Sequence, residues 1–335
     1  MELIQWGVPL IEWLQSQAWL EDPARLFSAL GDVRIMILWI PAVAWAVDWR
    51  LGRRLLLAMT AWGAVNTLVK VVASQPRPYW VEASVAPLAS ESSFGFASGH
   101  AAFAMVVWGA LALAVPKRWV RVLAAVMIVG IGASRIVLGV HWPADVIGGW
   151  LLGAGVLALV VWADGGIRPG TRTSPLTSLG PIGGMVATGL LGVLPLAVAT
   201  VAASRVGPVD PDWLALGARG AEAIDPTRLV GAGLLAGGLL GAVAGSVIST
   251  ARGQVPPIEL PIVHRVLRVA NGLLVLVFVT WSLGGMVDRA SITSVPLAWL
   301  LGAAVGWWVL DGSQRLFDRM GLSAVVPTAT AVRAP

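Results

Sequence analysis

The chain has 335 residues and a formal net charge of +5; 57% of its residues are apolar, 12% are charged and none is cysteine. Soluble domains carry about 25% charged residues, so this composition excludes a soluble globular protein. The missing cysteines exclude disulfides, thiolate zinc sites, iron–sulfur clusters and a cysteine nucleophile. The basic residues punctuate apolar runs and do not gather on one solvated face, which indicates a membrane protein and not a nucleic-acid-binding one.

The N-terminal stretch from Leu3 to Leu14 is apolar, with Gln5, Glu12 and Gln15 on one helical face. This pattern predicts an amphipathic helix that lies in the membrane interface, with a tenth membrane span as the alternative. The stretch lacks the basic start and the small-residue cleavage site of a secretory signal, so we expect no signal peptide here.

Nine apolar runs come close to the about 20 residues that cross the hydrocarbon core of a bilayer. They predict an all-α fold, a polytopic transmembrane bundle of about nine helices. The first and third runs are short and depend on tilt or on flanking tryptophans to span. The runs are residues 34–49, 54–73, 100–116, 119–140, 144–163, 181–203, 228–249, 266–287 and 292–311.

Lysine and arginine accumulate in the cytoplasmic loops of membrane proteins. With nine alternating spans, 14 of the 23 basic residues fall on one side and nine on the other. The side with 14 is therefore predicted to be cytoplasmic, in a protein of the cytoplasmic membrane. The outward-facing segments are then residues 74–99, 141–143, 204–227 and 288–291.

Residues 164–180 are rich in glycine, proline, serine and threonine, which is typical of a linker. We expect this cytoplasmic linker to separate a helical bundle over residues 1–163 from an accessory four-span unit over residues 181–321. The end of the chain, residues 322–335, is rich in small residues and predicts a disordered cytoplasmic tail.

The seventh run carries a ridge of glycines at four-residue intervals, which lets helices approach closely. We expect this ridge to pack against the N-terminal bundle or against a second copy of the chain in a homo-oligomer. The ridge consists of Gly233, Gly237, Gly241 and Gly245.

Lys70 lies at the outer end of the second run, and Arg77-Pro78 follows after six residues. A charge within hydrocarbon costs at least about 2.5 kcal/mol, so an ionisable residue in a span is a functional candidate. The structural alternative is that Lys70 snorkels to the lipid headgroups.

Ser98-Gly99-His100 immediately precedes the third run. Serine is a favoured N-cap, and the start of a helix presents free backbone N–H groups and the positive end of the helix dipole. Together these features bind anions. Taken alone, the cluster favours a capped helix that carries an interfacial histidine over an anion site.

Ser134-Arg135 lies near the end of the fourth run, and His141 and Asp145 follow it. A carboxylate four residues after a histidine can accept its Nδ1–H and leave the Nε2 lone pair free. Such an oriented neutral imidazole is a nucleophile or a general base. The alternative is a His–Asp helix cap. The third histidine, His264, lies on the cytoplasmic side and is expected to be an ordinary interfacial residue.

The predicted topology brings the three clusters to the same, outer membrane face. Three cations and a helix N-terminus suit a tetrahedral dianion such as phosphate. One histidine that attacks phosphorus and another that protonates the leaving oxygen would complete an in-line displacement. His100, His141 and Asp145 could be forced into a zinc site, but the surrounding cations would repel the ion, so we expect no metal and no other cofactor.

The ordered motifs resemble the type 2 phosphatidic acid phosphatase (PAP2) superfamily, in its branch of integral-membrane lipid phosphatases. The superfamily pattern is lysine, six residues and Arg-Pro; then Pro-Ser-Gly-His; then Ser-Arg, five residues, histidine, three residues and aspartate. This sequence departs from the pattern at Ala97, where proline would stiffen the entry to the helix. The resemblance covers about residues 30–163, and it is carried by Lys70, Arg77-Pro78, Ser98-Gly99-His100, Ser134-Arg135, His141 and Asp145.

The resemblance implies that His141 is a nucleophile that forms a phosphohistidine, that Asp145 orients it and that His100 is the general acid. It also implies a phosphate cradle that works without a metal. The cradle residues are Lys70, Arg77, Ser98, Gly99 and Arg135.

These features favour an integral-membrane lipid phosphatase, because a phosphate site at headgroup depth meets amphiphiles that hold their phosphate there. Phosphatidate, phosphatidylglycerophosphate and polyprenyl diphosphate are equally compatible substrates. The alternatives are a transporter or scaffold with a vestigial site, and a vanadate-dependent haloperoxidase. Glu82 and Glu91 in the outer loop are expected to be solvated charges and not headgroup selectors.

Overall fold

The computed structural model describes residues 6–163, 180–252, 260–288 and 291–323, and every regular element in these ranges is helical. The predicted all-α fold is confirmed. The nine apolar runs correspond, within a few residues, to α4 (Val33–Ala46), α5 (Trp49–Ala73), α7 (Gly99–Ala114), α8 (Arg118–Val137), α9 (Pro143–Ala163), α11 (Gly180–Ala203), α13 (Val230–Ala251), α14 (Ile262–Gly284) and α15 (Val295–Trp307).

The number of membrane spans is not confirmed as nine. Within the described ranges, six helices are long and apolar enough to cross a bilayer, and a seventh arises if α3 (Glu21–Leu30) and α4, bent by 50° at their junction, count as one span. Helix α7 has only 16 residues, because Ser98 caps its start and Pro116 follows its end. The apolar run predicted for this helix, residues 100–116, agrees with it within two residues and was expected to be short.

The predicted N-terminal interfacial helix is represented by α2 (Val8–Ser16). Its nine residues rise only about 14 Å, less than half of the hydrocarbon core, so α2 alone does not form a tenth span. Ile11 is fully buried against the outer loops, and the Gln15 amide donates to Ala86 O at 2.9 Å and to Val137 O at 3.1 Å. Helix α2 therefore covers the end of the bundle where α5 and α8 end. This end is named the outer end and its loops the outer loops, after the predicted orientation.

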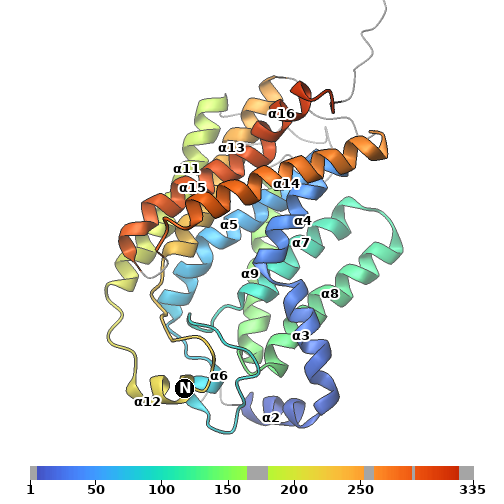
Figure 1. Cartoon of the computed structure of the whole chain (residues 1–335). Helices are drawn as coiled ribbons and strands as arrows, with labels where there is room; N and C mark the ends of the chain where they lie inside the picture. The colour runs from blue at the N-terminus through green and yellow to red at the C-terminus, as the bar shows by residue number, and fades with distance from the viewer. Residues whose placement is uncertain (1–5, 164–179, 253–259, 289–290, 324–335) are drawn as a thin grey trace, which may run out of the picture.

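Helix α5 lies at the centre of the molecule (Figure 1). It packs against α4, α7 and α9 from the N-terminal half and against α11 and α13 from the C-terminal half. The main hydrophobic core includes Trp45, Leu55 and Val106 together with Leu239 and Leu310. The two halves of the chain therefore share one core.

Two tryptophans tie this core to a π-helical turn, Trp308–Gly312, that follows α15. The indole nitrogen of Trp45 donates to Val309 O at 2.9 Å, and that of Trp49 donates to Leu310 O at 3.3 Å. Both bonds satisfy buried indole N–H groups that would otherwise be desolvated without a partner.

The glycine ridge of α13 packs against α15 of the same chain, so the expected partner was wrong. A Cβ added at Gly237 would lie 1.8 Å from Trp299 O, and one added at Gly241 would lie 1.9 Å from Ala303 O. Helix α13 does contact the N-terminal half, but through Gly238, which lies near Thr60 of α5. The glycine pattern shows that a close helix contact is possible but does not identify the partner helix. In the structure, α15 packs on the face for which an oligomer contact was expected.

The predicted linker and tail lie outside the described residues, except for Gly180 and residues 322–323. The structure therefore does not bear on their conformation.

The close approach of α13 and α15 gives a stability prediction. We expect Gly241→Ala to lower the free energy of unfolding by about 1–3 kcal/mol, because the new Cβ clashes with backbone and not with a movable side chain. Gly231→Ala on the same helix meets nothing within 4 Å and should stabilise by up to about 1 kcal/mol through helix propensity. Thermal unfolding in detergent measures both variants, and shifts of equal sign would contradict the packing.

Candidate active site

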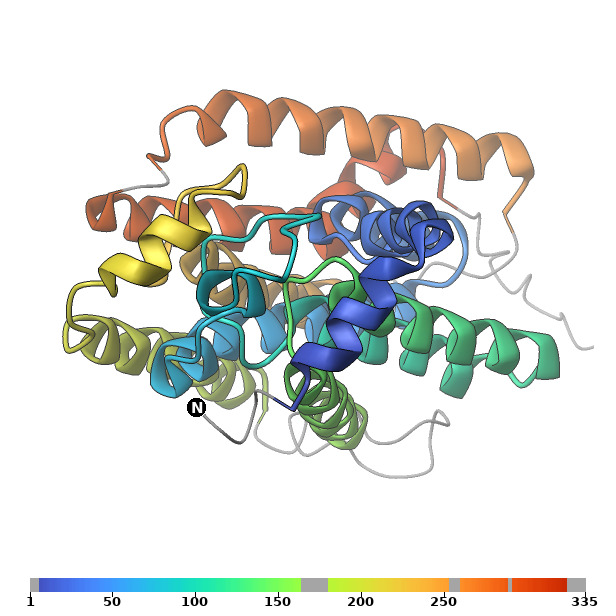
Figure 2. The same cartoon turned by 90° about the horizontal axis from the view of Figure 1, so that it is seen from below.

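Seen from below, the connection between α5 and α7 lies beside the ends of α5, α8 and α9 and the start of α7 (Figure 2). Buried polar side chains from these helix ends and from this connection form the candidate site. All eight residues singled out in the sequence lie here, although they span 76 positions of the chain. Their proposed catalytic roles stay a prediction. The residues are Lys70, Arg77, Ser98, Gly99, His100, Arg135, His141 and Asp145.

The His141 imidazole is held by the buried carboxylate of Asp145, with 3.1 Å between Nδ1 and Oδ2. The same Oδ2 accepts from Trp142 N at 3.0 Å, and Oδ1 accepts from the Gln75 amide at 3.1 Å. Nδ1 therefore carries the proton and Nε2 carries the lone pair. Nε2 lies 3.1 Å from Nη1 of Arg77, which can only donate, so both neighbours assign the same tautomer.

Arg77 is fully buried and has acceptors for all its N–H groups. Nε donates to Ser93 O at 2.6 Å, and Nη1 donates to Val140 O at 2.8 Å in addition to His141. Nη2 donates to the Ser93 hydroxyl at 3.2 Å and to Phe94 O at 3.1 Å. Ser93 and Phe94 of the outer loop, together with Val140, thus hold the buried guanidinium of Arg77 in place.

Lys70 follows the same principle, since its Nζ donates to Phe94 O at 2.6 Å. The lysine is 6% exposed, so it does not snorkel to the membrane surface. Ser98 is the N-cap of α7 as predicted, and its hydroxyl accepts from Ala101 N at 3.4 Å. Ser98 N in turn donates to Asp145 O at 3.0 Å, which fixes the start of α7 beside the start of α9.

Arg135 contacts two residues that the sequence analysis did not assign to the site. Its Nη1 donates to the hydroxyl of Ser28 in α3, and its Nη2 forms an ion pair with Glu91. The Glu91 carboxylate also lies 3.9 Å from Nη2 of Arg77 and 3.9 Å from Nδ1 of His100.

The expectation that Glu91 is a solvated loop charge is therefore wrong. Its side chain is only 27% exposed and faces the cations of the site. Burial alone would raise the pKa of Glu91, but Arg135 and Arg77 beside it lower that pKa to about 2. The Tyr79 hydroxyl fixes the position of Glu91 by donating to Glu91 O at 3.0 Å and accepting from Glu91 N at 3.1 Å. Since these are tertiary contacts, sequence spacing could not place Glu91 at the site.

No group of three or more histidine, aspartate or glutamate side chains suited to a metal ion occurs among the described residues. The donors present, namely buried cations and the N-terminus of α7, suit an oxyanion.

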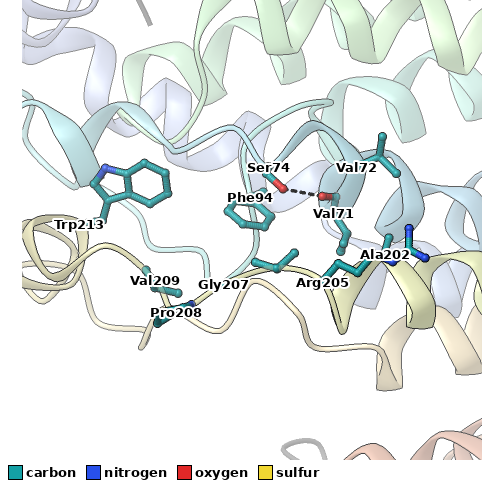
Figure 3. Close-up of a pocket in the computed structure, with 11 residues that line it drawn as sticks. Val71, Val72, Ser74, Phe94, Ala202, Arg205, Gly207, Pro208, Val209 and Trp213 are labelled. Atoms are coloured by element: carbon teal, nitrogen blue, oxygen red, sulfur yellow. Dashed lines mark hydrogen bonds between the residues drawn. The ribbon is translucent and has the colours of Figure 1, made fainter.

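A cavity of about 500 Å³ lies beside this site, between the outer ends of α5 and α11 (Figure 3). Its lining is mostly apolar, with Arg205 and Ser74 as polar members, and includes Trp213. Phe94 belongs to both regions: its side chain lines the cavity, and its carbonyl accepts from Lys70. The cavity is not the catalytic centre, since neither histidine of the site lines it.

Parts of the sequence are similar to known proteins. A family model described as the PAP2 superfamily matches residues 51–167. Over 125 residues the chain is 36% identical to phosphatidylglycerophosphatase B of Bacillus subtilis, covering 34% of this chain and 59% of that protein. Over 128 residues it is 31% identical to an undecaprenyl-diphosphatase of Sulfolobus acidocaldarius, covering 37% of this chain and 62% of that protein.

Among solved structures, the chain is similar to the crystal structure of a transmembrane PAP2-type phosphatidylglycerolphosphate phosphatase from Bacillus subtilis. The identity is 30%, the TM-score is 0.38, and the match covers 45% of this chain and 83% of that chain.

The protein is thus a multi-pass helical membrane protein with a buried cluster of cationic and histidine side chains at one end of its bundle. Through residues 51–167 it belongs to the PAP2 superfamily. It spans only 59% and 62% of the two curated relatives described above.

The cradle gives a binding prediction. We expect Lys70→Met to raise the Kd for inorganic phosphate about 10- to 100-fold, because a charged donor to the anion is lost. Lys117→Met provides the control, since Lys117 is the second of only two lysines and is exposed beyond the end of α7. Calorimetric titration in detergent measures both, and an unchanged Kd for Lys70→Met would remove this residue from the cradle.

Proposed function

We propose that the protein is an integral-membrane phosphatase that hydrolyses a lipid phosphate or diphosphate at the outer face of the cytoplasmic membrane, through a phosphohistidine on His141. The observation that carries this proposal is the buried His141–Asp145 pair, with 3.1 Å between Nδ1 and Oδ2, set among three cations and the start of α7. An imidazole oriented in this way has its Nε2 lone pair available to attack phosphorus.

In the first step, Nε2 of His141 forms a bond to phosphorus while the bond from phosphorus to the leaving oxygen breaks. Lys70, Arg77 and Arg135 hold the three equatorial oxygens, which carry the charge of the transition state. Asp145 stabilises the positive charge that develops on the His141 ring. His100, as general acid, gives its proton to the leaving oxygen.

In the second step, His100 takes a proton from water, and the water oxygen attacks phosphorus as the bond to Nε2 breaks. Phosphate leaves and His141 returns to its neutral state. Because Arg77 donates to Nε2 before the substrate binds, the phosphoryl group has to take over this Arg77 N–H before attack begins.

The substrate class is supported by two observations. The site lies at one end of the long apolar helices, and lipid headgroups hold phosphate at the ends of membrane spans. The curated relatives bear names of enzymes for phosphatidylglycerophosphate and for undecaprenyl diphosphate. Both a phosphomonoester and a diphosphate lipid therefore belong in the first substrate screen.

The central experiment measures phosphate release by the purified protein from phosphatidate, phosphatidylglycerophosphate and a polyprenyl diphosphate, with EDTA present. We expect His141→Ala to lower kcat by at least about 10³-fold, because no other group takes the place of the nucleophile. His264→Ala, at the remaining histidine outside the site, is the control and should keep wild-type activity.

Two further outcomes separate the alternatives. If His141→Ala retains the rate of the wild type, the site is vestigial and the protein is a transporter or scaffold. If the protein releases no phosphate but brominates a reporter dye after vanadate is added, it is a haloperoxidase. Trapping of an acid-labile phosphoprotein during turnover, absent from His141→Ala, would support the intermediate directly.

A further inference from the structure

We propose that Glu91 is a positioning residue for the general acid: its carboxylate stabilises the protonated form of His100 and keeps Arg135 turned toward the phosphate. This inference rests on the proposed function and adds a residue that the PAP2 sequence motifs do not include.

The charges around His100 make such a partner necessary. Burial of the imidazole is the largest effect that opposes the binding of a proton, and Arg135 from α8 and Arg77 from the outer loop act in the same direction. Glu91 and Asp32, at the junction of α3 and α4, act in the opposite direction. A general acid has to carry its proton when the substrate arrives, so a carboxylate beside His100 is needed to oppose burial and the two arginines.

Of the two carboxylates, Glu91 is the one in contact with the catalytic groups. Its Oε1 lies 3.9 Å from Nδ1 of His100 and also pairs with Nη2 of Arg135. Asp32 is engaged elsewhere, since it caps α4 and forms an ion pair with Arg34 at 2.6 Å.

The position of Glu91 is fixed by its backbone as well as by its charge. The hydroxyl of Tyr79, the only tyrosine in the sequence, bonds both the N–H and the carbonyl of Glu91. The ring of Tyr79 is fully buried. The carboxylate is therefore held beside His100 before the substrate binds, as a preorganised charge.

Glu91→Gln tests the proposal, because it removes the charge and keeps the size of the side chain. With an alkyl phosphate, whose alkoxide leaves only when protonated, we expect kcat to fall about 10²-fold. With p-nitrophenyl phosphate, whose phenolate leaves without a proton, the fall should be much smaller. The alkaline limb of the kcat/KM profile for the alkyl phosphate should move about one pH unit lower.

Glu12→Gln, the same change at an exposed residue of α2, is the control and should match the wild type for both substrates. Equal losses for both substrates would overturn the proposal, because they would mean that Glu91 acts only on Arg135 or on folding. Tighter phosphate binding and faster turnover in Glu91→Gln would also overturn it and would make Glu91 a competitor of phosphate. A wild type that releases no phosphate from any ester would instead overturn the proposed function.

A separate observation concerns the C-terminal half, which lies outside the residues matched to the family. We infer that residues 217–225, on the outer segment between α11 and α13, position the loop that holds the cradle cations. Ala221 N donates to the Ser90 hydroxyl at 2.7 Å, and Asp225 N donates to Ser92 O at 2.9 Å. These two bonds flank Glu91 and adjoin the carbonyls that accept from Arg77.

Arg219 adds further hydrogen bonds between residues 217–225 and the outer loop. Its guanidinium donates to Tyr79 O at 2.8 Å, Ala83 O at 2.8 Å and Glu82 O at 3.1 Å. The carbonyls belong to α6 (Pro78–Val81) and to the residues just after it, directly following Arg77 in the chain. Arg219 thus connects the C-terminal half to the segment that carries a cradle cation.

We expect Arg219→Ala to weaken the binding of inorganic phosphate about tenfold and to speed hydrogen exchange in residues 88–95, with Arg219→Lys restoring part of both. Arg205→Ala, at an exposed arginine of the neighbouring cavity, should change neither. Thermal unfolding in detergent separates positioning from folding. Unchanged phosphate binding in Arg219→Ala, or a loss that follows a lower Tm in every variant, would overturn the inference.

Discussion

The site depends on one constraint: three cationic side chains lie buried at the outer end of the bundle and need acceptors when no anion is bound. An unpaired charge in such a place costs several kcal/mol, and breaking a buried pair leaves that penalty uncompensated. Most of the acceptors come from the outer loop, namely the carbonyls of Ser93 and Phe94 and the carboxylate of Glu91. Val140 O and the Ser28 hydroxyl supply the others. The conformation of the irregular outer loop thus follows from the charges it has to satisfy.

Under the proposed function, the same arrangement determines how a phosphoryl group enters. A phosphate oxygen does not meet free cations but exchanges with acceptors already in place, such as Nε2 of His141, which accepts from Arg77. Binding is therefore a replacement of one set of charge-assisted hydrogen bonds by another, and little reorganisation of the cations is needed. The net gain comes from the extra charge of the phosphate. This gain grows in the transition state, which favours catalysis over tight ground-state binding.

The local signals in the sequence predicted the helices and the convergence of the eight candidate residues, because helix periodicity and motif spacing act over few residues. The ends of α5, α7, α8 and α9 follow from the apolar runs, and those ends bring Lys70, His100, Arg135 and His141 together. Glu91, Gln75 and Ser28 were missed because they reach the site through loops or a distant helix, and only tertiary contacts place them. The partner of the glycine ridge was wrong, because a surface that permits close packing does not specify its neighbour.

The C-terminal half illustrates why a family match over part of a chain does not delimit a functional unit. Residues 51–167 contain every matched motif, yet α5 packs on α11 and α13, and the indole of Trp45 bonds Val309. At the outer end, Arg219 and the backbone of Asp225 bond the same loop that neutralises the cradle. A loop of this kind has no regular pattern of backbone hydrogen bonds to fix its conformation, so contacts with neighbouring elements have to fix it. In this protein the C-terminal half provides part of that order, and the geometry of the phosphate site is therefore a property of both halves together.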